Sequence, residues 1–92
     1  MIKSYRNKGL RAFAEKGETR KLAVQQPDKI RRILALLNAA TRPGEMDVPG
    51  LKYHSLAPGQ KGRYSVWVSG NYRVTFAFEG PDAVDVDLED YH

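Results

Sequence analysis

The last third of the chain, residues 63–92, alternates apolar and polar side chains with a period of two. The pattern forms three runs, whose apolar members are Tyr64, Val66 and Val68, then Tyr72, Val74, Phe76 and Phe78, then Val84, Val86 and Leu88. This period predicts strands that bury one face. Between the runs stand Ser69-Gly70-Asn71 and Gly80-Pro81-Asp82, which are typical of tight turns. The pattern therefore predicts an antiparallel three-stranded meander with one apolar face.

Two upstream stretches have the spacing of amphipathic helices instead. Their apolar positions are Leu10, Phe13 and Ala14 in the first stretch and Ile30, Ile33, Leu34 and Leu37 in the second. Asn7 suits an N-cap and Gly17 the position after a helix, so a helix is expected from about Lys8 to Lys16. Pro27 suits a first helical position, and the second helix is expected to run from there to about Ala40.

The remaining segments are short. Residues 1–5 could form an edge strand and residues 52–56 a further short strand, while residues 17–26 and 57–62 are polar or rich in Gly and Pro and predict loops. Helices followed by strands indicate an α+β fold of two layers, with both helices packed on one face of a small antiparallel sheet. The length of 92 residues favours a single domain, residues 1–92.

Composition excludes several kinds of site. The chain has no cysteine, which rules out disulfides, thiolate metal ligands and cysteine nucleophiles. No apolar run approaches the roughly 18–20 residues of a membrane span, and no apolar signal core follows the N-terminal charges. We therefore expect a cytoplasmic protein that does not enter a membrane. Phosphate-binding loops of the Walker type, dinucleotide fingerprints and nucleophile elbows are absent from the sequence.

The formal charge of +4 is unevenly distributed. Residues 1–46 hold eleven Lys and Arg against four Asp and Glu, a net +7, whereas residues 47–92 hold four against seven, a net −3. A basic half suggests a polyanion or an acidic partner, although a solvated basic helix face would have the same composition. Aromatic residues interleave with basic ones in the strands, and Trp67 is either a platform for stacking bases or the core of a second small layer.

Proton-transfer chemistry has few candidates. The only histidines are His54, which precedes the meander, and His92, which ends it. Asp90 and Tyr91 stand next to His92, and Arg73 lies on the polar side of the middle strand. Each has an ordinary structural interpretation, because surface histidines, frayed termini and solvated strand arginines are common. A metal site of His54, Asp90 and His92 is conceivable, but its spacing matches no known ligand motif.

Several segments taken together resemble the HigB toxins of bacterial toxin–antitoxin modules, in the RelE superfamily. They are Lys52-Tyr53-His54-Ser55-Leu56, Gly62-Arg63-Tyr64-Ser65-Val66, Asn71-Tyr72-Arg73-Val74-Thr75-Phe76-Ala77-Phe78, the closing Glu89-Asp90-Tyr91-His92, and the basic N-terminus. The resemblance implies a RelE-like fold of the microbial-RNase type and metal-independent cleavage of mRNA in the A site of the 70S ribosome, with no cofactor. It also implies a helix-turn-helix antitoxin, HigA, through which the toxin would reach operator DNA.

Carried over residue by residue, the resemblance assigns the active site to His54, Arg73, Asp90, Tyr91 and His92. The family often has a lysine where this chain has Ala57. Lys52, Lys61 and Arg63 are the candidate replacements and the predicted RNA-binding residues. Two alternatives stay open: a catalytically silent ribosome-binding or antitoxin-binding module, and a small metal-dependent hydrolase.

Overall fold

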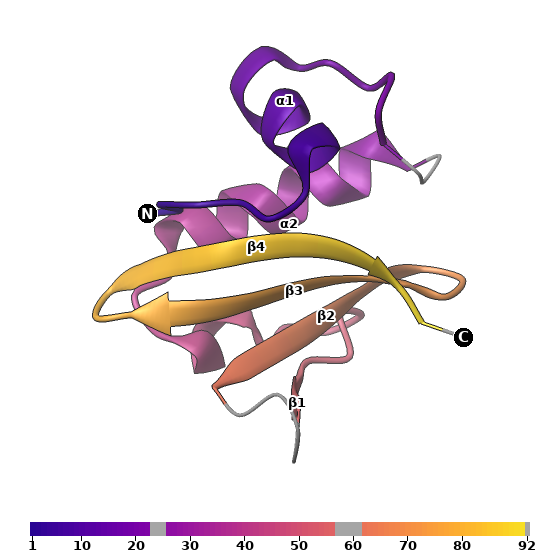
Figure 1. The fold of residues 1–92 in the computed structure, drawn as a ribbon. Coiled ribbons are helices and arrows are strands. Elements are labelled where there is room, and N and C mark those ends of the chain that lie inside the picture. The colour runs from indigo at the N-terminus through magenta and orange to yellow at the C-terminus, as the bar shows by residue number, and fades with distance from the viewer. Residues whose placement is uncertain (23–25, 57–61, 92) are drawn as a thin grey trace.

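The computed structural model describes residues 1–22, 26–56 and 62–91 and has two helices, a short 3-10 helix and four strands (Figure 1). In chain order the elements are α1 (Lys8–Lys16), α2 (Pro27–Ala39), η1 (Pro43–Met46), β1 (His54–Leu56), β2 (Arg63–Ser69), β3 (Tyr72–Glu79) and β4 (Asp82–Asp90). The expected α+β order is confirmed, including the meander, both helices and the extra short strand before the meander. The 3-10 helix at Pro43 was not expected.

The four strands form one antiparallel sheet in the order β1-β2-β3-β4. Figure 1 shows α2 crossing behind this sheet, with α1 stacked on α2 and the opposite sheet face turned toward the viewer. The N-terminal segment runs along β4, where Ile2 and Tyr5 make isolated parallel bridges to Ala83 and Val86. Residues 1–5 therefore lie at a sheet edge, as expected, but they form no continuous strand.

Local sequence explains where α1 begins and ends and where α2 begins. The side chain of Asn7 caps α1 by accepting a hydrogen bond from the backbone N–H of Leu10 at 2.8 Å. Gly17 ends α1 in the left-handed conformation, with a φ of 72° that glycine tolerates best, and its N–H donates to the carbonyl of Phe13. Pro27 opens α2, where its missing N–H costs no helical hydrogen bond.

The core lies between the helices and one face of the sheet. Its buried members include Leu10 and Phe13 from α1, the predicted stripe of α2, and alternate residues of the strands; the strand members are Val66, Val68, Val74, Phe76, Ala83, Val86 and Leu88. Met46 and Leu51 close the end of this core. Because the helices bury only this face, the other face of the sheet remains available for polar side chains.

A register shift in β4 changes which residues face the core. Between Thr75 and Ala77 the pairing partners jump from Asp87 to Val84, so β4 carries an extra residue at Asp85, whose φ is 52°. Ala83 rather than Val84 joins the core cluster. The prediction that Val84 shares the core face with Val86 was therefore wrong, because strict alternation does not survive a bulge.

No helix in the described parts of the chain is long and apolar enough to cross a membrane.

Candidate active site

His54 opens β1 at the outer edge of the sheet, where it pairs with Ser65 of β2. Its Nδ1 lies 3.0 Å from the backbone carbonyl oxygen of Lys52. A carbonyl can only accept, so this bond requires the proton to be on Nδ1 and leaves a lone pair on Nε2. Nε2 faces the polar side of the sheet, 3.5 Å from the hydroxyl of Ser65.

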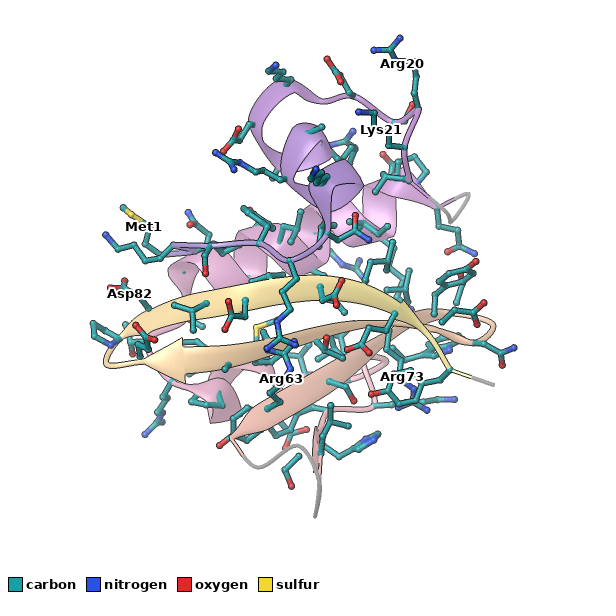
Figure 2. All side chains as sticks on the ribbon, in the orientation of Figure 1. Met1, Arg20, Lys21, Arg63, Arg73 and Asp82 are labelled. Atoms are coloured by element: carbon teal, nitrogen blue, oxygen red, sulfur yellow. The ribbon has the colours of Figure 1, made fainter. Side chains whose placement is uncertain are left out.

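Arg73 approaches the same nitrogen from β3. Its Nη1 lies 3.2 Å from Nε2 of His54, and the guanidinium carbon lies 5.1 Å from the centre of the Tyr91 ring. The strand register makes this possible, because Arg73 pairs with Trp67 on one side and Glu89 on the other. Figure 2 shows Arg73 on the sheet face turned toward the viewer, close to the C-terminal end of β4. His54 from β1, Arg73 from β3 and Tyr91, which follows β4, thus gather on the polar face.

Tyr91 is half-buried and held by its backbone, since its N–H donates to the carbonyl of Asn71 at 2.7 Å. Its phenol oxygen is buried and has no hydrogen-bond partner among the described residues. Burial raises the pKa of Tyr91, and the Glu89 carboxylate raises it further, while Arg73 and Arg63 oppose the rise. The phenol therefore keeps its proton at neutral pH and can donate a hydrogen bond to a bound group.

Beneath this cluster runs a network that the sequence did not reveal. The Nη2 of Arg63 donates at 2.9 Å both to the hydroxyl of Thr75 and to the carbonyl of Asp85, and the Thr75 hydroxyl donates to Oε2 of Glu89 at 2.5 Å. Arg63 is only 7% exposed, although Figure 2 shows that it lies on the same sheet face as Arg73. A buried side chain with these partners does not fit a direct contact with RNA. Arg63 instead holds Thr75, and through it Glu89.

The other predicted residues have varied positions. Asp90 pairs with Tyr72 and is exposed, and strand alternation sends its side chain to the face opposite Glu89 and Tyr91. Lys52 is exposed, with its Nζ 4.6 Å from the centre of the Trp67 ring. Trp67 is half-buried and lies outside the core cluster. Lys61, Ala57 and His92 lie outside the described residues.

Thr75, Ser65 and Glu89 are the polar residues of this face that sequence reasoning missed. Glu89 had a signal, because it continues the period-two series of Asp85 and Asp87. Among residues 1–22, 26–56 and 62–91, no three His, Asp or Glu side chains are grouped so that they could hold a metal ion. The cluster can accept a proton at His54, neutralise an anion with Arg73 and donate a hydrogen bond from Tyr91.

Comparison with known proteins decides the family. Residues 3–92 match the model of the HigB-like toxins, described as RelE-like toxins of the type II toxin–antitoxin system HigB. The chain belongs to the HigB-like toxin family. It is also 39% identical to the protein named Endoribonuclease HigB from Proteus vulgaris, over 92 residues that cover both chains completely.

Membership of this family confirms the resemblance recognised in the sequence and the RelE-like fold. A HigB-like toxin of a type II module has an antitoxin as its partner. The toxin function of this family agrees with the cluster of imidazole, guanidinium and phenol groups on the sheet face opposite the helices.

Proposed function

We propose that this HigB-like toxin is a ribosome-dependent endoribonuclease that cleaves mRNA in the A site and so inhibits translation. The observation that carries the proposal is the contact between Nη1 of Arg73 and Nε2 of His54 at 3.2 Å, on the sheet face opposite the helices. The Proteus vulgaris relative, identical at 39% of positions over its full length, is named an endoribonuclease. RNA contains its own nucleophile, the 2′-hydroxyl, so the protein has only to move protons and stabilise charge. No metal is needed for that.

His54 is the general base in this mechanism. The hydrogen bond from Nδ1 to the Lys52 carbonyl, 3.0 Å long, favours the tautomer whose Nε2 can accept a proton. When a phosphate draws Arg73 away, Nε2 becomes free to take the proton of the 2′-hydroxyl. The oxygen then attacks the adjacent phosphorus, the bond to the 5′ oxygen breaks, and the products are a 2′,3′-cyclic phosphate and a 5′-hydroxyl.

Arg73 stabilises the negative charge that grows on the phosphate oxygens during this attack. Its planar guanidinium can donate two parallel hydrogen bonds to a phosphate, and the packed ring of Tyr91, 5.1 Å away, helps to orient it. Glu89, which accepts a hydrogen bond from Thr75, lies opposite Arg73 in the strand register.

The leaving 5′ oxygen must receive a proton. Tyr91 is suited to this step or to positioning the base, because its phenol is protonated at neutral pH and lacks a partner among the described residues. By family resemblance His92 is the other candidate for the acid, whereas strand alternation turns Asp90 toward the opposite face of the sheet. The antitoxin partner is proposed to be a HigA-like helix-turn-helix protein that carries the toxin to operator DNA.

Controlled expression in a bacterial host tests the proposal. The wild type, Arg73→Ala, His54→Ala and His92→Ala would be induced, followed by growth measurements and mapping of mRNA 5′ ends. We expect the wild type to arrest growth and to produce new 5′ ends in phase with codons, and the three variants to lose both effects. Arg11→Ala is a matched control, since Arg11 is an exposed arginine of α1 paired with Glu15.

Growth arrest without codon-phased ends would reject the nuclease and favour the silent binding module. Loss of cleavage when the toxin alone is treated with a chelator, freed of the chelator and then added to ribosomes in Mg²⁺ would instead favour the metal-dependent hydrolase. Equal losses in Arg11→Ala and Arg73→Ala would show that general positive charge, rather than this site, produces the effect.

A further inference from the structure

Trp67 is the only tryptophan in the chain, and two lysine side chains lie over its ring. The Nζ of Lys29, from α2, is 4.0 Å from the ring centre, and the Nζ of Lys52 is 4.6 Å from it. Attraction of each ammonium to the indole holds two like charges close together. The ammonium groups also cover the ring, so a base cannot readily stack there. Any ligand of this cluster must therefore be recognised through the lysines.

The cluster contains more positive charge than the surrounding residues neutralise. Arg32 lies one helical turn after Lys29, and its charge acts together with that of Lys52 on Lys29. Burial, Arg32 and Lys52 all lower the pKa of Lys29, which is the effect expected of neighbouring cations. No ion pair found in the described residues includes Lys29, Arg32 or Lys52, and the nearby carboxylate of Asp28 is bound by Arg31.

Lys29 and Arg32 border a surface hollow, and Lys52 links the cluster to the active site. Lys29 and Arg32 line a hollow of about 450 Å³, together with Gln26, Pro27 and Asp28. Lys52 has a φ of 49°, rare for a residue with a side chain, and this conformation accompanies two contacts. Its carbonyl accepts the hydrogen bond from His54, while its Nζ lies over Trp67, which pairs with Arg73.

We propose that Lys29, Arg32 and Lys52 form a second phosphate-binding subsite, which holds the backbone of single-stranded RNA next to the phosphate being cleaved. The inference rests on the proposed endoribonuclease function and extends it. An RNA strand at His54 and Arg73 has further phosphates within reach of Lys52, because Lys52 and His54 are two residues apart and hydrogen-bonded. This continuity favours RNA over an acidic protein segment. Recognition through phosphates adds affinity without sequence preference.

The single tryptophan makes the subsite directly measurable. The probe is a short single-stranded 2′-O-methyl oligonucleotide, which binds but cannot be cleaved because it lacks the nucleophile. We expect its binding to change Trp67 fluorescence, with an affinity that falls as salt is added. The double variant Lys29→Gln with Arg32→Gln should bind roughly 10- to 30-fold more weakly at about 0.1 M salt, and its salt slope should fall by about 1.4, because each lost contact with a single strand contributes about 0.7.

Lys8→Gln with Lys16→Gln is the matched control, because it removes two exposed lysines of α1 that have no contact with Trp67. Its affinity, measured by anisotropy of a labelled oligonucleotide, should stay close to that of the wild type. Circular dichroism melts check that both double variants fold. Equal losses of affinity in the two variants would overturn the subsite, since they would reflect net charge alone.

Two competitors test the class of ligand. Inorganic phosphate should compete only weakly, because it offers one phosphate where the strand offers several. Poly-glutamate that displaces the oligonucleotide at equal or lower concentration would overturn the proposal and assign the cluster to an acidic protein. Binding by this assay does not depend on catalysis. A wild type that binds through Lys29 and Arg32 but cleaves no mRNA on ribosomes would reject the nuclease and leave the phosphate subsite standing.

Discussion

Replacing Thr75 by Val tests the buried network beneath the active site. Valine has nearly the same shape, but it cannot accept the hydrogen bond from Arg63 or donate one to Glu89, at 2.9 and 2.5 Å. Thr75 is fully buried and Arg63 nearly so, so water cannot easily replace the lost partner of the guanidinium. Loss of the hydrogen bond to the charged guanidinium costs roughly 1.5–3 kcal/mol. Loss of the hydrogen bond to Glu89 costs less, because that carboxylate is partly exposed to water. We expect Thr75→Val to lower the free energy of unfolding by about 2–4 kcal/mol.

The assay is urea unfolding followed by circular dichroism, with Thr75→Ser as the control. Serine keeps the hydroxyl and loses one methyl group, which should cost about 1 kcal/mol. For a chain of this size, the valine variant should lose roughly 10–25 °C in melting temperature. If Thr75→Val unfolds at the same urea concentration as Thr75→Ser, the hydroxyl is not holding Arg63, and the structural role given to that arginine is refuted.

Three further outcomes are expected. Arg73→Lys should lose most mRNA cleavage, roughly 100-fold in rate, because a lysine cannot make two parallel bonds to a phosphate; the rate on programmed ribosomes measures it. The pKa of Tyr91 is raised by burial and Glu89, so its contribution to stability is complete below about pH 10 and lost as the pH rises through the folded-state pKa. Melts between about pH 9 and 11 should show a loss that is smaller in Tyr91→Phe, where only Tyr5 and Tyr53 keep a pKa raised by burial. Gly9→Ala should destabilise by roughly 1–3 kcal/mol in urea, despite better helix propensity, because its Cβ would meet the backbone carbonyl of Lys21.

Helices and turns could be predicted because their determinants are local. The bond from Leu10 N–H to the Asn7 side chain spans three residues, and the positive φ of Gly17 is a property of that residue alone. The apolar stripe of α2 needs only a partner surface, which the meander provides. Sequence periodicity was therefore sufficient for both helices and for the three-stranded meander, whereas the pairing of β1 with β2 is seen only in the structure.

The bulge in β4 depends on distant residues and could not be read from the sequence. The N–H of Asp85 donates to the hydroxyl of Ser4, 81 positions away, and its carbonyl accepts from Arg63. These contacts stabilise a positive φ that a pattern of alternating residues cannot signal. The shift also decides that Ala83 rather than Val84 meets the core.

The candidate site was predicted in part. His54, Arg73 and Tyr91 were named through family resemblance, and the antiparallel register brings them together. Glu89 was not singled out in the sequence and Arg63 was predicted to contact RNA, because alternation along a strand does not show that Arg63 is buried and supports Glu89 through Thr75. A family motif identifies which residues take part, but only the packing shows which of them are buried.

The chemical ends of the cleaved mRNA test the central claim most directly. Purified toxin would be added to ribosomes programmed with a defined mRNA, and the termini of both fragments analysed by mass spectrometry. Attack by the 2′-hydroxyl, with His54 as base and Arg73 on the phosphate, predicts a 2′,3′-cyclic phosphate or its hydrolysis product on one fragment and a 5′-hydroxyl on the other. A 3′-hydroxyl paired with a 5′-phosphate would mean that water was the nucleophile, and would contradict the account.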